Sequence, residues 1–148
     1  MRICLQRVLE AYVEIDNKMI SEIGKGMLLF VGFRKDDNDS FIDAIVNKII
    51  HLRIFPNNLG KFDKSIEDIA GEMLVVSQFT LFGNVNKGNR PDFTLSMPFV
   101  EAETLYNRFV DTLSMCYYKD RVKTGVFGAK MIVGLKNDGP VTLIIDYP

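Results

Sequence analysis

Histidine and cysteine are scarce in this sequence, which narrows the chemistry that it can perform. The chain has one histidine, His51, and two cysteines, Cys4 and Cys116. A Ser-His-Asp triad would have a single possible base, and His51 falls within a helical pattern, away from its apolar stripe. Two distant cysteines suit neither a zinc site nor a disulfide framework. Glycine motifs that bind phosphates or dinucleotides are also missing, so we predict neither a metal nor a cofactor.

Long apolar runs and net charge are lacking as well. No stretch approaches the roughly 20 apolar residues of a membrane span, and Met1 to Arg7 does not resemble a secretory signal. We therefore expect a cytoplasmic protein without membrane contact. The net charge is −1, so contact with nucleic acid would require a local patch of lysine and arginine.

The sequence does contain a regular order of apolar patterns. Its 148 residues, of which 47% are hydrophobic, predict one domain over 1–148. Amphipathic helices are expected at 41–52 and after Pro98, with Ser96 or Met97 as the cap of the second. Strands are expected at 2–16, 19–23, 27–33, from 72, and at 121–124, 129–135 and 141–146, with a hairpin at 53–62. The predicted fold class is α+β, with a mostly antiparallel β-sheet, a barrel-like core and two helices.

The segment from Met73 to Gly83 changes character halfway along. It begins as an apolar run typical of a strand buried on both faces, and then Ser77, Gln78 and Thr80 introduce polar groups. Buried polar groups are costly unless they are hydrogen-bonded. Two interpretations stay open: a site held by a rigid strand, or a strand end whose polar side chains cap the following loop.

A second unusual segment runs from Asn137 to Thr142. Proline cannot donate to a strand ladder, and Gly139 before Pro140 permits backbone geometries that other residues avoid. The residues alone predict a hairpin turn that projects at Gly139-Pro140 and is followed by an edge strand. They also favour a trans peptide bond, since only about one X–Pro bond in twenty is cis.

Together these segments carry a resemblance. Ser77-Gln78-Phe79-Thr80-Leu81 and Asn137-Asp138-Gly139-Pro140-Val141-Thr142 resemble the two signature motifs of the D-aminoacyl-tRNA deacylase family. Shorter similarities occur in the family's order across nearly the whole chain: Gln6-Arg7-Val8, Arg53-Ile54-Phe55, Gly60-Lys61, Lys87 to Pro91, Ala102-Glu103, Leu105-Tyr106, Thr124-Gly125 and Phe127-Gly128. Asp92 and Phe62 depart from the family's usual residues, outside both signatures.

The resemblance implies the dimeric fold of this family and its activity, the hydrolysis of the ester bond of D-aminoacyl-tRNA. It implies a homodimer with active sites at the subunit interface, and a cis Gly139–Pro140 bond that enters the partner's pocket and excludes L-amino acids. Glycine mischarged on tRNA-Ala is an expected further substrate. The implied catalytic residues are Ser77, Gln78, Phe79 and Thr80. The implied supporting residues are Arg7, Asn137 and Met131.

Three questions stay open at this level. Thr80 is either a hydrogen-bonding residue or a nucleophile, which would need an adjacent base. A non-catalytic nucleic-acid-binding protein of the same fold and a general ester hydrolase are the alternatives to a deacylase. Clusters of basic residues are usually solvated surface without a binding role. Beside the two signatures, contact with tRNA is expected at Lys87, Arg90, Lys119, Arg121, Lys123 and Lys130.

Overall fold

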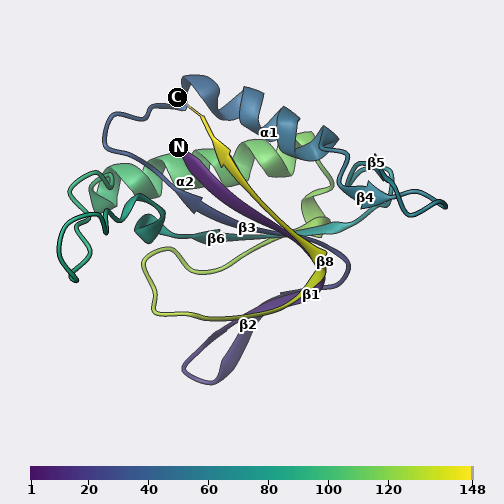
Figure 1. Cartoon of the computed structure of the whole chain (residues 1–148), viewed down its shortest axis with the longest axis horizontal. Coiled ribbons are helices and arrows are strands. Elements are labelled where there is room, and N and C mark those ends of the chain that lie inside the picture. Colours follow the sequence, from purple (N-terminus) through teal and green to yellow (C-terminus); the bar gives the residue numbers. More distant parts are fainter. Residues whose placement is uncertain (148) are drawn as a thin grey trace.

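The computed structural model describes residues 1–147, which contain a curled six-stranded sheet. Its strands are β1 (Arg2–Ile15), β2 (Lys18–Ile23), β3 (Gly26–Gly32), β6 (Glu72–Ser77), β7 (Val122–Thr124) and β8 (Ile132–Asp146). β8 follows β1 for almost its whole length, while β3 and β2 pair with successive parts of β1. A long strand paired along both edges twists strongly, and in Figure 1 the β1–β8 pair crosses the direction of β3 and β6.

The pairing directions confirm the predicted α+β, barrel-like architecture. β1 is antiparallel to β2, β3 and β8, whereas β3–β6 and β6–β7 are parallel pairs. A separate two-stranded sheet forms from β4 (Phe55–Pro56) and β5 (Phe62–Lys64), at the predicted hairpin.

The sheet has a hydrophobic core on each face because alternate residues of its central strands point in opposite directions. Met27 and Leu29 of β3 enter the larger core, whereas Leu28 enters the smaller one; Met73 and Leu74 of β6 divide in the same way. Burial on both faces explains why β3 and β6 have continuous rather than alternating apolar runs.

Two helices cover one face of the sheet (Figure 1). They are α1 (Ile42–His51), preceded by the short helix η1 (Asp39–Phe41), and α2 (Phe99–Cys116), followed by η3 (Lys119–Arg121). The apolar residues predicted at three- and four-residue spacing, such as Ile45 and Phe109, are fully buried. Within residues 1–147, neither helix has the length and apolarity needed to cross a membrane.

The predicted cap of the second helix is wrong by one or two residues. Pro98 is the cap of α2, and its side chain makes no capping hydrogen bond. Ser96 is occupied elsewhere, because its hydroxyl donates to the carbonyl of Phe79 at 3.1 Å.

The predicted hairpin turn at Asn137 to Gly139 is also wrong. Residues on both sides of it belong to the single strand β8, which stays antiparallel to β1 throughout. Val8 pairs with Asn137 and Gln6 pairs with Thr142, so the segment 138–141 lies opposite Arg7 alone. The turn residues therefore form a large bulge in a continuous strand. β1 is long enough to pair with β8 on both sides of the bulge, so the chain does not reverse its direction there.

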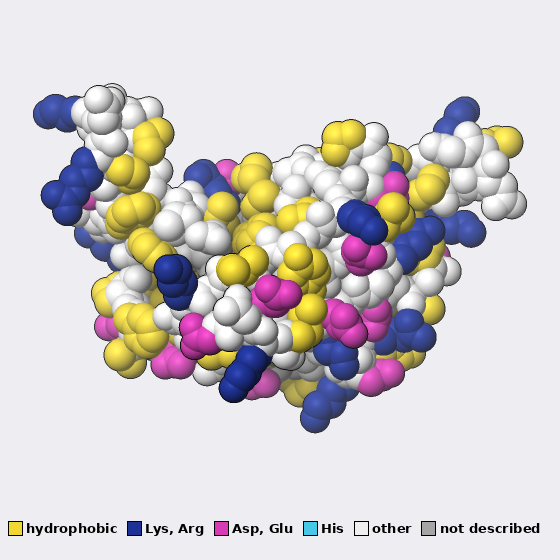
Figure 2. Space-filling model, turned by 90° about the horizontal axis from the view of Figure 1, so that it is seen from below, with side chains coloured by type: hydrophobic (Ala, Val, Ile, Leu, Met, Phe, Trp, Pro, Cys, Tyr) yellow, Lys and Arg dark blue, Asp and Glu magenta, His cyan; other side chains and the backbone are white. Residues whose placement is uncertain are grey.

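Figure 2 shows the molecule from below, with a projection at either end and a hollow between them. By their positions in Figure 1, the projections are the loop 84–92 at the left and the β4–β5 hairpin at the right. Apolar side chains gather on the face between them.

Candidate active site

The polar residues of the first signature lie where β6 ends. The strand stops at Ser77 and the chain turns into the short helix η2 (Phe79–Phe82). Ser77 and Gln78 are half-buried, and Phe79 and Thr80 are exposed. Thr80 lies outside the core, because the strand ends before reaching it.

Hydrogen bonds fix this turn from several sides. The backbone N–H of Gln78 donates to Val31 on β3 at 2.8 Å, and the N–H of Gly83 donates to Thr80 at 2.9 Å. The Gln78 side-chain amide donates to the Thr80 hydroxyl oxygen at 2.5 Å. Since this oxygen already accepts a hydrogen bond, the hydroxyl proton of Thr80 is available for donation away from Gln78.

A pocket of about 500 Å³ opens beside the turn. Ser77 and Gln78 contribute its polar groups, and side chains from α2 and from the segment 127–133 form its mostly apolar wall. Its lining includes Phe79, Met97, Phe99, Phe127 and the predicted Met131. A mostly apolar pocket with a few convergent polar groups is the usual form of a small-ligand site. Sequence reasoning missed Met97 and Phe99, which look like ordinary residues of a helix start.

Gly139 and Pro140 of the second signature do not line this pocket. Both are exposed on the bulge of β8, and the peptide bond between them is cis. Gly139 has φ 114°, a conformation that L-residues rarely adopt. The trans bond favoured by sequence statistics is therefore wrong, and the cis bond implied by the resemblance is confirmed. Within one chain the two signatures are not brought together.

The side chain of Asn137 closes the bulge from within. Its oxygen accepts from the backbone N–H of Val141 at 3.2 Å, and its amide donates to the Thr142 hydroxyl at 2.9 Å. Gln6 on β1 donates to the same hydroxyl at 3.2 Å. Asn137 thus shapes the segment that contains Gly139 and Pro140.

Arg7 lies buried beneath the bulge, with 6% of its surface exposed. Its Nη1 donates to the carbonyl of Ile54 at 2.5 Å, and its Nε lies 2.9 Å from Asp138 Oδ2. Through these contacts Arg7 joins three elements: β1, the bulge of β8 and the start of the β4–β5 hairpin.

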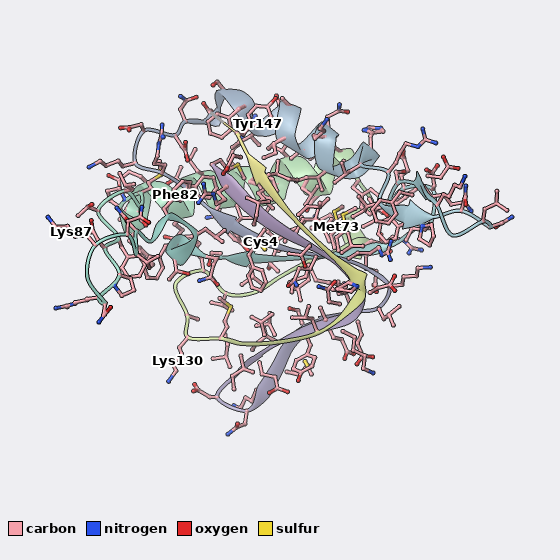
Figure 3. All side chains as sticks on the ribbon, viewed as in Figure 1. Cys4, Met73, Phe82, Lys87, Lys130 and Tyr147 are labelled. Atoms are coloured by element: carbon pink, nitrogen blue, oxygen red, sulfur yellow. The ribbon has the colours of Figure 1, made fainter. Side chains whose placement is uncertain are left out.

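The predicted basic residues differ in their surroundings. Lys87, Arg90, Lys119 and Lys130 are exposed, and Figure 3 shows Lys87 and Lys130 pointing outward from loops on the same side of the molecule. Lys123 is half-buried on the sheet's edge strand β7. Arg121 donates to the carbonyl of Ala70 and lies 5.9 Å from the ring centre of Tyr118. Arg121 therefore has a clear structural role, whereas Lys87, Lys119 and Lys130 are exposed to solvent.

The single histidine lies outside the pocket lining. His51 is the exposed last residue of α1, and its Nδ1 is 2.8 Å from the carbonyl of Asn47. Among residues 1–147, no three His, Cys, Asp or Glu side chains gather in a way that would hold a metal ion. The lining of the pocket offers the polar groups of Ser77 and Gln78 within a mostly apolar wall.

Comparison with known proteins places these features in a family. The family model "D-Tyr-tRNA(Tyr) deacylase" matches residues 4–146. A D-aminoacyl-tRNA deacylase of Nitratiruptor sp. is 52% identical, over 96% of this chain and 95% of the relative. Another, from Aquifex aeolicus, is 49% identical over 99% of this chain and 97% of the relative.

A solved structure described as "c-Myc DNA Unwinding Element Binding Protein" has a TM-score of 0.95 and 42% identity, covering 100% of this chain and 99% of its own. The family model and both relatives extend over nearly the whole chain, including the two signatures. This chain therefore belongs to the D-Tyr-tRNA(Tyr) deacylase family, a family of ester hydrolases.

Proposed function

We propose that this protein hydrolyses the ester bond between a D-amino acid and the 3′ end of tRNA, and thereby proofreads translation. The observation that carries the proposal is the hydrogen-bonded turn from Ser77 to Thr80, which opens on an apolar pocket in a chain of the deacylase family. Water attacks the carbonyl carbon and the bond to the ribose oxygen breaks. The acyl group retains the hydroxyl, and the ribose oxygen takes the proton.

The reaction requires stabilisation of charge more than it requires a strong base, because the ester is already labile. The N–H of Phe79 has no partner within its own turn, since it is the first residue of η2. Together with the hydroxyl of Thr80, it supplies donors for the oxyanion that forms on the carbonyl. The neighbouring ribose 2′-hydroxyl assists the proton transfer. We assign Ser77 and Gln78 to the support of this turn.

Thr80 acts as a hydrogen-bond donor in this proposal and forms no covalent intermediate. A threonine nucleophile needs an adjacent group that removes its proton. The neighbour of the Thr80 hydroxyl oxygen is the Gln78 amide, which is a donor. This contact supports the hydrogen-bonding role over the nucleophile.

Selection of the D-enantiomer requires two copies of the chain in this proposal. Gly139 and Pro140 are exposed and lie outside their own pocket, so they are available to enter the pocket of a partner. Exposed apolar side chains on β8, Ile132 and Ile144, offer contact surface for that partner. Two-fold symmetry then completes two equivalent sites. Backbone carbonyls of Gly139 and Pro140 bind the α-ammonium and leave no space for an L side chain, whereas glycine is accepted, including from tRNA-Ala.

The body of the tRNA meets basic side chains at the surface of the protein. We propose that Lys87 and Arg90 of the loop 84–92 contact phosphates, together with Lys119, Lys123 and Lys130. Arg121 contributes less, because its guanidinium is already engaged with Ala70 and Tyr118. Met131 shapes the pocket wall, and Asn137 shapes the bulge.

A non-catalytic nucleic-acid-binding role is the second candidate, and it is favoured by the name of the similar solved structure. It predicts binding of nucleic acid with no turnover. A protein that only binds has no need for the pocket beside Ser77 and Gln78.

Release of D-tyrosine and of L-tyrosine from charged tRNA by the purified protein tests the proposal. We expect rapid release of D-tyrosine, and of glycine from glycyl-tRNA-Ala, with L-tyrosyl-tRNA spared. Equal hydrolysis of the D and L substrates would reject chiral selection. Binding without hydrolysis of either substrate would favour the second candidate.

A further inference from the structure

The guanidinium group of Arg7 is enclosed by parts of the chain that are distant in sequence. Its Nη1 donates to the Ile54 carbonyl at 2.5 Å, and its Nε lies 2.9 Å from Asp138 Oδ2. The ring centre of Phe62, on β5, lies 5.5 Å from its central carbon. A Cβ placed on Gly139 would come within 2.9 Å of its Nη2. The bulge of β8 therefore rests directly on this planar cation.

Asp138 balances the charge of this cation. The Arg7 side chain is 7% exposed and that of Asp138 is 28% exposed, so the pair is mostly withdrawn from water. A buried cation that loses its paired carboxylate is strongly unfavourable and tends to move toward solvent. Such movement would withdraw Nη2 from beneath Gly139. The ion pair with Asp138 therefore keeps the guanidinium of Arg7 in place beneath Gly139.

Phe62 covers the same cation from the β4–β5 hairpin. Its ring faces the guanidinium within the range of a cation–π contact. The hairpin is itself fixed, because the Asn57 side chain accepts from the backbone N–H groups of Leu59 and Lys61 at 2.8 and 3.1 Å. Phe62 is 58% exposed, although large apolar side chains are more often buried. The ring of Phe62 thus contacts Arg7 although more than half of its surface is exposed.

We propose that Asp138 and Phe62 are positioning residues that act through Arg7 to hold Gly139 and Pro140 in the orientation that selects D-amino acids. The inference rests on the proposed function, because it requires that Gly139 and Pro140 exclude the L side chain. Neither residue contacts the substrate. Their effect is on selectivity: a loosened bulge retreats from the pocket that it enters and admits the L-enantiomer.

The test compares initial rates on D-tyrosyl-tRNA and L-tyrosyl-tRNA for Asp138→Asn, Asp138→Glu and Phe62→Leu. Asn keeps the size of Asp without its charge, and Leu keeps an apolar cover without the aromatic face. We expect Asp138→Asn to lower the D-to-L rate ratio by at least about tenfold, since small displacements of positioned groups have effects of this order. Hydrolysis of the L substrate should rise in absolute terms. Phe62→Leu should shift the ratio in the same direction by a smaller factor, and Asp138→Glu should restore part of it.

Glu10→Gln is the matched control. Glu10 pairs with Lys136 at 2.9 Å, again between β1 and β8, but both side chains are more than half exposed and neither contacts Arg7. Its D-to-L ratio should equal that of the wild type. A faster L reaction cannot result from loss of folded protein, so the readout separates positioning from general stability.

Two sets of outcomes keep the inference separate from the proposed function. A wild-type protein without D preference rejects the proposed function itself. A selective wild type whose Asp138→Asn and Phe62→Leu variants keep the ratio within twofold rejects the inference alone. Parallel loss of both activities, with the ratio unchanged, rejects it as well. Phe62 is exposed at the surface, so Phe62→Leu remains a folded test even if the Asp138 variants do not fold.

Discussion

The hydroxyl of Thr80 forms a hydrogen bond with the side-chain amide of Gln78, a residue that lines the pocket. The amide donates and the hydroxyl oxygen accepts, which directs the threonine proton outward. In the proposed mechanism, Thr80 then donates to the carbonyl of the substrate, and the ribose hydroxyl of the substrate assists the proton transfer.

Replacement of Thr80 tests this assignment. We expect Thr80→Ala to lower the rate on D-tyrosyl-tRNA by about 10- to 100-fold, as for the loss of one oxyanion donor, and to leave measurable turnover. Thr80→Ser keeps the hydroxyl and should stay within a few-fold of the wild type. Rapid-quench assays followed by mass spectrometry supply the measurement. A D-aminoacyl adduct trapped on Thr80 of the wild type would contradict the account.

Tyr117 shows how one side chain ties an element to the fold. Its hydroxyl, at the end of α2, donates to the carbonyl of Gly71 at 2.8 Å and lies 3.3 Å from that of Ile66, and burial raises its pKa to about 12. The tether holds α2 against the segment that leads into β6.

Tyr117→Phe should reduce the free energy of unfolding by about 1 to 2 kcal/mol, because the buried carbonyl of Gly71 loses its donor. Tyr118→Phe is the control, since the neighbouring ring is exposed. Urea titration followed by circular dichroism measures both variants. Equal stability of the two would show that the hydrogen bonds of Tyr117 contribute nothing.

At the scale of elements, the loop 84–92 projects beside the pocket and carries Lys87 and Arg90 (Figure 3). The pairing of Asn84 with Asp92 closes its base, with N···O distances of 2.7 and 2.9 Å. Its cations are therefore held away from the body of the protein. A phosphate backbone can reach them without entering the pocket.

Charge reversal of this loop tests its role in binding tRNA. Lys87→Glu with Arg90→Glu should weaken tRNA binding uniformly across tRNA species. It should also reduce the slope of log affinity against log salt by about one for each phosphate interaction that is removed. The control is Lys18→Glu with Lys48→Glu, which makes the same change of charge at exposed residues of β2 and α1. Fluorescence anisotropy over a salt series measures the slope. An unchanged slope in the Lys87/Arg90 variant would remove this loop from the RNA surface.

The elements also show how far sequence reasoning reaches. Local patterns of apolar residues were sufficient to predict β3, β6 and α1. A strand buried on both faces has a continuous apolar run, and a helix buried along one stripe has apolar residues at three- and four-residue spacing. The bulge of β8 was missed, because Asn137-Asp138-Gly139 has the same turn chemistry in a hairpin and in a bulge. Only the distant pairing with β1 distinguishes the two. The ion pair of Arg7 with Asp138 is equally non-local, because it joins the two long strands β1 and β8.

At the scale of the whole molecule, each chain carries both signatures but keeps them apart. The turn from Ser77 to Thr80 lies at its own pocket, and Gly139 and Pro140 lie exposed on β8. A dimer in which each bulge completes the partner's pocket gives both signatures a role in one site. Gly139→Ala should damage this site from within, because the new Cβ would meet Arg7 of its own chain and φ would be strained.

Mixed dimers of Thr80→Ala and Gly139→Ala chains, purified through two different affinity tags, test the shared site most directly. In the heterodimer one site carries both lesions and the other carries neither, by symmetry. We expect about half of the wild-type rate on D-tyrosyl-tRNA, together with the wild-type preference over L-tyrosyl-tRNA. A heterodimer whose rate equals only the mean of the two homodimers, and whose fast site lacks D preference like that of Gly139→Ala alone, would contradict the account.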